Sequence, residues 1–191
     1  MKGHDFMKFK KFQSLAKNAG QIEIIQIKES KLQFLNNGYT VYPVHKLPEL
    51  NNEMIFALLD IDEKKRDDYA ITRVNNTSLN YNDIDETEEP VVSASFTIKF
   101  ANLDNTVRPV FTRRGLYYYD PKWLEPFEGD YDSLFIRCDN NFDSQPYIAV
   151  KSGIFIVGFI ILRNLNLQLK MFANKSNEDL RTLCSMLEVI E

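Results

Sequence analysis

The sequence predicts an α+β protein built mainly on an antiparallel sheet, with an N-terminal helix, short internal helices and a C-terminal helix. Apolar residues recur at spacings of three and four near both ends of the chain, at residues 5–19 and 176–189, which is typical of amphipathic helices. Between them, short apolar segments follow one another across tight turns, which favours antiparallel strands over alternating strands and long helices. With 191 residues, 44% of them hydrophobic, the chain can bury a core without disulfides or a structural metal.

The first predicted element is a helix over residues 5–19. Asp5 suits the N-cap, and Gly20 supplies the residue at which helices commonly end. Its apolar positions would face a core, and its other face is basic, because residues 1–20 hold five lysines against one acid. The apolar positions are Phe6, Phe9, Phe12, Leu15, Ala16 and Ala19.

Strands are predicted next, at residues 22–27, 32–35 and 39–42. Asn37-Gly38 joins the last two, and this pair predicts a type I′ turn, in which both central residues need a positive φ. A short helix capped by Asn51 or Asn52 and a strand at residues 69–74 complete the first half.

The second half is predicted to hold more strands and one short internal helix. Asp120-Pro121 favours a helix start, and Trp123, Leu124 and Phe127 would be its buried residues. Ser176 with Asp179 three residues later begins the C-terminal helix. The strands are expected at residues 91–101, 107–112, 116–119, 133–138, 147–151 and 154–162.

The acidic, asparagine-rich segment 75–90 predicts a linker or loop. It has few apolar side chains to offset the cost of ordering its backbone, about 1–2 kcal/mol per residue. The predicted organisation is therefore an N-terminal α+β half at residues 1–74, the acidic segment, and a β-rich half at residues 91–191.

The cysteine content and the length of the apolar runs indicate where in the cell the protein is expected. The two cysteines, Cys138 and Cys184, have no metal-ligand spacing and predict free thiols in a reducing cytoplasm. The longest apolar run, residues 154–162, is much shorter than the roughly 20 residues of a membrane-spanning helix. A cytoplasmic location without membrane contact is expected.

Common catalytic patterns are missing from the sequence. The two histidines, His4 and His45, lack a second histidine at zinc-site spacing, and no nucleophile elbow, phosphate-binding glycine loop or dinucleotide fingerprint occurs. The acidic run 82–89 lacks the central glycine of a calcium loop, so a solvated loop is predicted there, with a divalent-cation site as the alternative. A non-enzymatic protein without metal or cofactor is expected.

Two basic groups suggest binding to DNA. Arginine side chains bind phosphate bidentately, and the neighbouring tyrosines at residues 117–119 could stack on bases. The alternative is a hairpin with a charged turn and tyrosines that alternate between core and surface. The candidate nucleic-acid-binding residues are Lys8, Lys10, Lys11, Lys17, Arg108, Arg113 and Arg114.

A second hypothesis assigns the protein to a different class, a phage or mobile-element accessory protein that binds another protein. On a strand, at least one ring of the three tyrosines should face outward, exposed or covered by a partner. A mobile acidic strip could imitate a phosphate backbone for a partner's basic groove. The candidate partner-binding residues are Tyr118, Asp83, Asp85 and Glu86.

The order of motifs in residues 115–162 also carries a family resemblance. A strand leads to a helix start formed by Asp120, Lys122, Trp123 and Leu124, and three strands follow, with Pro146 at the second of them. This pattern resembles the closing part of a DNA sliding-clamp domain.

The resemblance implies a homo-oligomeric ring or half-ring that tracks DNA through phosphate contacts and offers an outer hydrophobic pocket to partner peptides. Clamp helices that face the DNA carry several basic residues, whereas the segment 121–127 offers only Lys122. The lysine-bearing helix 5–19 would then supply the basic inner face.

Overall fold

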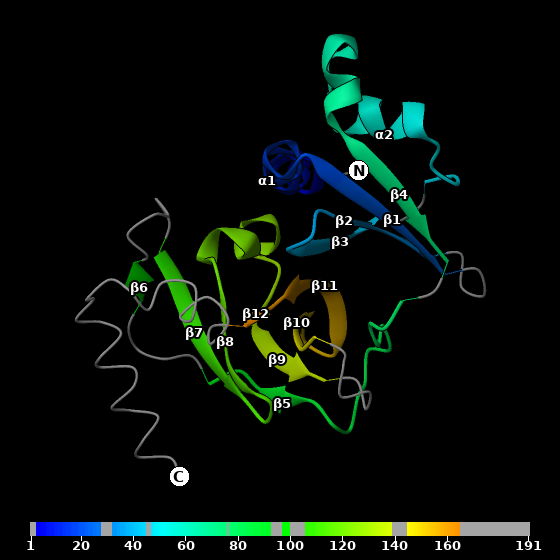
Figure 1. Ribbon diagram of the computed structural model, residues 1–191. Coiled ribbons are helices and arrows are strands. Elements are labelled where there is room, and N and C mark those ends of the chain that lie inside the picture. Colours follow the sequence, from blue (N-terminus) through cyan, green and yellow to red (C-terminus); the bar gives the residue numbers. More distant parts are fainter. Residues whose placement is uncertain are drawn as a thin grey trace. The chain divides into compact units, whose positions relative to one another are not determined.

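The computed structural model describes residues 3–27, 32–44, 47–75, 77–92, 97–99, 106–138 and 145–164 (Figure 1). The helical elements are α1 (Gly3–Ala19), α2 (Asn52–Leu58) and the 3₁₀ helices η1 (Glu63–Asp68) and η2 (Pro121–Phe127). The strands are β1 (Gln21–Ile27), β2 (Leu32–Asn36), β3 (Thr40–Val44), β4 (Ala70–Val74), β5 (Glu89–Pro90), β6 (Ile98–Lys99), β7 (Thr106–Thr112), β8 (Gly115–Tyr119), β9 (Ser133–Arg137), β10 (Tyr147–Ser152), β11 (Phe155–Ile161) and β12 (Arg163–Asn164). The predicted mainly antiparallel α+β architecture is confirmed, whereas the predicted C-terminal helix lies outside the described residues.

The chain divides into two compact units, each assembled from two segments. The first unit holds Met1–Val91 and Pro121–Leu162, and the second holds Val92–Asp120 and Arg163–Glu191. This grouping differs from the expected halves on either side of residues 75–90. The physical reason is that β3 pairs with β11, at Val41 opposite Phe159, so strands distant in sequence share one sheet.

In the described residues, the first unit contains an eight-stranded sheet in the order β4-β1-β2-β3-β11-β10-β9-β5. Its neighbouring strands run antiparallel, apart from the parallel pair β1–β4. Strand β4 therefore lies at one edge of the sheet and β5 at the opposite edge.

One face of this sheet is covered by helices. Phe12 of α1 and Ile55 of α2 share a buried cluster with Leu35 of β2. Phe127 of η2 stacks on Tyr42, with ring centroids 5.8 Å apart. Gly158 allows this packing, because a Cβ there would lie 2.2 Å from the Phe127 ring.

The opposite face of the sheet carries a second apolar cluster that includes Ile25, Phe34 and Phe159. Leu79 and Tyr81 pack against it, so the acidic segment lies over this face. We call residues 77–88 the strap. The strap belongs to the connection that takes the chain from edge strand β4 to edge strand β5 (Figure 1).

The length of that connection agrees with such a path. Seven strand spacings measure about 34 Å, and the fourteen residues between Val74 and Glu89 reach at most about 46–50 Å when fully extended. Much of the connection must therefore be extended. The predicted acidic linker is instead an element that crosses the first unit's sheet.

The Asn37-Gly38 turn differs from the predicted type I′ geometry. Gly38 has a φ of +87°, but Asn37 does not have a positive φ, and Asn36 pairs with Val41 across a four-residue loop. The Asn37 side chain accepts hydrogen bonds from the backbone N–H groups of Tyr39 and Thr40, at 3.0 and 2.8 Å. This local side-chain capping replaces the tighter turn.

Two short helices agree with their sequence signals in part. Asn51 caps α2 by accepting from the Met54 N–H at 2.9 Å, as predicted. In η2, Leu124 and Phe127 are buried as expected, while Trp123 is half-buried and stacks on Tyr39 with a centroid distance of 4.6 Å. Pro126 lacks an N–H donor, which is consistent with a 3₁₀ helix rather than an α-helix.

The second unit contains an antiparallel sheet in the order β12-β8-β7-β6, as far as its described residues show. Of the predicted strand at residues 91–101, the structure describes residues 91–92 and 97–99, and Ile98–Lys99 forms β6. In the described part of the chain, the helices are too short or too polar to cross a membrane.

Candidate functional site

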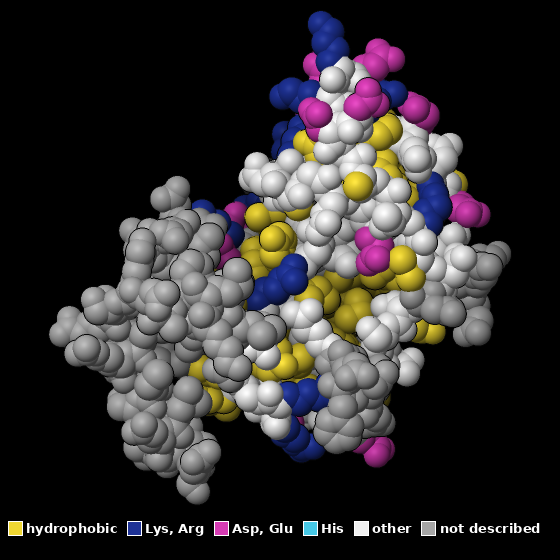
Figure 2. Space-filling view, viewed as in Figure 1, with side chains coloured by type: hydrophobic (Ala, Val, Ile, Leu, Met, Phe, Trp, Pro, Cys, Tyr) yellow, Lys and Arg dark blue, Asp and Glu magenta, His cyan; other side chains and the backbone are white. Residues whose placement is uncertain are grey.

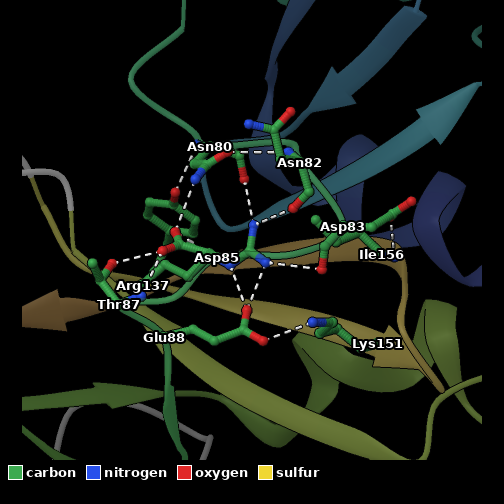
Figure 3. Close-up of polar contacts among 10 residues, drawn as sticks. Asn80, Asn82, Asp83, Asp85, Thr87, Glu88, Arg137, Lys151 and Ile156 are labelled. Carbon is green, nitrogen blue, oxygen red and sulfur yellow. Dashed lines mark hydrogen bonds and ion pairs between the residues drawn. The ribbon is translucent and has the colours of Figure 1, made fainter.

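A buried ion network fastens the strap to the sheet (Figure 3). At its centre is Arg137, at the end of β9, whose side chain is 1% exposed. Its Nε and Nη2 donate to Glu88 Oε2 at 2.9 and 2.6 Å, and its Nη1 donates to the carbonyl oxygens of Asn80 and Asn82 at 2.8 and 2.7 Å. Nη2 also donates to the Asp83 carbonyl at 3.3 Å. With these bonds the five guanidinium N–H donors all have acceptors in the strap.

A second buried cation completes the network. Lys151 of β10 donates to Glu88 Oε1 at 2.7 Å and lies over the Phe135 ring, 5.0 Å from its centroid. Asp85 Oδ2 lies 3.8 Å from Arg137 Nε. The two cations and the carboxylates of Asp85 and Glu88 sum to zero charge, so the low-dielectric site is electrically balanced.

Asp85 is also held by strap residues. Its Oδ1 accepts from the Thr87 hydroxyl and N–H at 2.7 and 2.9 Å, and its Oδ2 accepts from the Asn80 amide at 2.8 Å. Burial alone would raise the pKa of Asp85, but these hydrogen bonds and the Arg137 charge lower it overall. Asp85 is therefore ionised at neutral pH and is committed to contacts within the chain.

The strap carboxylates point to different partners rather than to one centre. Asp83 Oδ1 accepts from the Ile156 N–H at 2.9 Å, while Asp85 and Glu88 serve the contacts above (Figure 3). Across the ranges that the structure describes, three or more His, Cys, Asp or Glu side chains do not converge on a common metal position. The arrangement is that of an anchor for the strap.

Next to this anchor, three large apolar side chains are exposed. Ile84 of the strap is 71% exposed, and Ile154 and Phe155 at the β10–β11 turn are 59% and 62% exposed. We call these three residues the apolar tip. The strap and the turn meet here because Asp83 bonds to Ile156, the residue after Phe155.

Carboxylates surround the apolar tip. Asp132 Oδ2 accepts from the Gly153 N–H at 2.7 Å, which holds this carboxylate beside the turn. The hydrogen bonds from the Gly153 N–H and from the Ser133 hydroxyl lower the pKa of Asp132. Asp83 and Glu86 flank Ile84 in the strap, and both are exposed. The tip is thus an apolar surface with an acidic rim formed by Asp83, Glu86 and Asp132.

The candidate DNA-binding lysines of α1 are partly neutralised by acids. Lys11 pairs with Glu128, whose hydrogen bond raises the pKa of Lys11. Lys17 donates to Asp60 Oδ2 at 3.1 Å. Lys10 is exposed, and the Lys8 side chain lies outside the described residues. In Figure 2, acidic and basic side chains also intermingle over the end of the molecule that carries α2 and η1.

The candidate arginines lie in the other compact unit. Arg108 is exposed on β7, and Arg113 and Arg114 occupy the β7–β8 turn, where Arg113 is exposed and Arg114 half-buried. The structure therefore assigns the two predicted basic groups to different units.

The expectation of an outward tyrosine in β8 is wrong. Tyr118 is 6% exposed, and Tyr117 and Tyr119 are buried as well, so Tyr118 is not available as a surface contact. Strand β8 lies between β7 and β12, and its side chains are buried on both faces of the sheet. Asp85 is half-buried and lies against Arg137, whereas Asp83 and Glu86 lie at the rim of the apolar tip.

Sequence reasoning missed Arg137 and the apolar tip. One signal was present: alternation along β9 puts Arg137 on the same face as Phe135, and a charge on an apolar strand face calls for a buried counter-ion. Ile154 directly after Gly153 was the corresponding signal for an apolar turn.

Comparison with known proteins gives no relative to carry a function over from. The chain matches no family model, no curated protein and no solved structure.

Proposed function

We propose that the chain is a non-enzymatic binding protein that recognises a partner protein through the apolar tip. The observation that carries this proposal is the exposure of Ile84, Ile154 and Phe155 on a part of the chain that is otherwise fixed by hydrogen bonds. Burying a side chain of this size stabilises a complex by about 1.5–3 kcal/mol. Exposed large apolar side chains with a polar rim are typical of interaction sites.

The chemistry of the ion network supports a role without catalysis. An acid–base group must reach the proton that it transfers. Glu88 is largely buried, and both of its oxygens bond to Arg137 or Lys151. These groups therefore serve to hold the strap, and the surface that the strap presents is the functional part.

The alternative proposal, a clamp-like protein on DNA, requires several cations that are open to phosphate. Lys11 and Lys17 instead lie against acids of the same chain. A phosphate would have to compete with Glu128 and Asp60 for them. The exposed candidate cations Lys10, Arg108 and Arg113 favour the DNA alternative, but the lysine and the two arginines belong to different units.

A salt series with double-stranded DNA separates the two proposals. We expect no measurable binding even at 50 mM salt, because Lys11 and Lys17 lie against acids of the same chain. A protein that makes about 6–10 phosphate contacts would instead bind at 50 mM salt and lose roughly 10³–10⁵ in affinity by 200 mM. Fluorescence anisotropy with a labelled duplex measures this. Salt-dependent binding that is weakened by Lys10→Gln or Arg108→Gln would overturn the partner-protein proposal in favour of DNA.

A further inference from the structure

We infer that the apolar tip and its acidic rim form a docking surface for a cationic segment of a partner protein, one in which large apolar residues are flanked by lysine or arginine. This inference rests on the proposed function and specifies the chemistry of the partner. Three features of the surface support it: its composition, its charge and its rigidity.

The apolar composition of the tip predicts that the partner contributes large apolar side chains to the contact. Ile84, Ile154 and Phe155 are each more than half exposed, although they are aliphatic or aromatic. A protein contact that covers them removes apolar surface from water without first moving any part of this chain. The patch is small, so the complex belongs to the weak or transient class, below about 1,200 Å² of total interface.

The charge of the rim selects the partner. The carboxylates of Asp83, Glu86 and Asp132 lie beside the tip, and the low pKa of Asp132 keeps it ionised. A cationic segment would place its charges against these carboxylates, which speeds encounter and fixes register. An anionic segment would be repelled.

The same charge argues against a second copy of this chain as the occupant. In a two-fold symmetric contact, the tip of one copy would meet the tip of the other, because such an interface uses the same patch on both chains. The acidic rims would then face each other. The chain's net charge of −4 adds to that repulsion.

The surface is rigid before binding. On one side, Arg137 and Lys151 hold the strap through Glu88. On the other side, the Asp83 bond to Ile156 and the Asp132 bond to Gly153 fix the strap and the turn against the sheet. A preorganised surface loses little conformational freedom on binding, so a small patch can still give specific affinity.

The test uses two synthetic peptides with the same number of leucines, one alternating leucine with lysine and the other alternating leucine with glutamate. Each is titrated against the full chain by isothermal calorimetry at low and high salt. We expect saturable, salt-sensitive binding of the lysine peptide and no binding of the glutamate peptide.

Variants locate the binding on the chain. Replacing both Ile154 and Phe155 by Ser should weaken the lysine peptide by at least about tenfold. Val92→Ser is the matched control, because Val92 is 68% exposed but lies in the other compact unit, and it should leave binding unchanged.

Charge variants test the rim. The double variant Asp83→Asn and Glu86→Gln should weaken the lysine peptide and flatten its salt dependence. The double variant Glu63→Gln and Asp67→Asn removes the same charge from exposed positions on η1 and should have little effect. All variants alter exposed side chains, and matching urea unfolding curves verify that they fold.

The outcomes separate the inference from the proposed function. Equal binding of both peptides, lost in the Ile154 and Phe155 variant, would overturn the cationic partner while the proposed binding role stands. Binding of the lysine peptide that is insensitive to the tip variant would overturn the docking site. DNA binding in the salt series would overturn the proposed function itself.

Discussion

Asp60 has a backbone conformation that L-residues rarely adopt. It follows α2 with a φ of 52°, the one positive φ among the described non-glycine residues. Its N–H donates to the Ala57 carbonyl at 3.2 Å, and the Ile61 N–H donates to the Phe56 carbonyl at 2.9 Å. This is the hydrogen-bond pattern of a Schellman motif, in which glycine is the usual residue at the left-handed position.

Asp60→Gly should therefore stabilise the protein by about 1 kcal/mol, because glycine adopts this conformation without the Cβ clash. The substitution also removes the ion pair with Lys17, but the Asp60 side chain is 84% exposed, and such surface pairs contribute about 0–1 kcal/mol. Urea unfolding measures the change. Asp60→Asn is the control for charge and should unfold near the wild-type midpoint, so a glycine variant less stable than the asparagine variant would contradict the prediction.

At the scale of elements, the strap differs from the helices and strands in what holds it. Its backbone crosses the sheet largely without regular pairing, and Leu79 and Tyr81 are its residues packed against the apolar cluster. Most of its attachment is polar and converges on Glu88 and Arg137. Losing one partner of a buried ion network leaves the other partner's charge without compensation.

Glu88→Gln should destabilise the protein by about 3–5 kcal/mol, because the buried Arg137 and Lys151 would lose their shared carboxylate. Glu86→Gln, an exposed change in the same strap, should alter stability by less than about 0.5 kcal/mol. Urea unfolding gives both values, and hydrogen exchange should show faster exchange in residues 77–88 of the Glu88 variant. Equal stability of the two variants would show that the strap does not depend on the network.

At the scale of the molecule, chain connectivity decides which segments fold together, and surface charge decides whether copies of the chain associate. The first unit is discontinuous, since residues 92–120 leave it and Pro121 returns to it. Truncation at the acidic segment would therefore remove strands β9, β10 and β11 from the eight-stranded sheet. Acidic residues at the apolar tip oppose its use for self-association.

Light scattering at micromolar concentration should give the mass of one chain, 22.3 kDa, because the proposed binding surface needs a single copy. A clamp-like ring would instead give a multiple of that mass. The rim variant Asp83→Asn with Glu86→Gln provides the control. If the wild type is monomeric and this variant associates, the carboxylates are what keep the tips of two copies apart.

Local patterns in the sequence were sufficient for most elements of the fold. The apolar periodicity of residues 5–19, the Asn51 cap and the short apolar runs that form β9, β10 and β11 act over a few residues, so each could be predicted from neighbouring side chains. For the candidate site, the acidic segment stands out in the sequence by its charge, and two of its predicted contacts, Asp83 and Glu86, lie at the rim of the apolar tip.

Tertiary structure alone decided which side chains are buried and which are exposed. Tyr118 and Asp85 are covered, Arg137 is enclosed by a strap that precedes it by some fifty residues, and Phe155 is left in solvent at a strand's start. The pairing of Val41 with Phe159 brings distant segments into one sheet and makes the acidic segment cross it. Burial depends on such long-range contacts, whereas residue spacing reports only the local backbone. Local patterns therefore predict the elements of this protein but not the surface that they present.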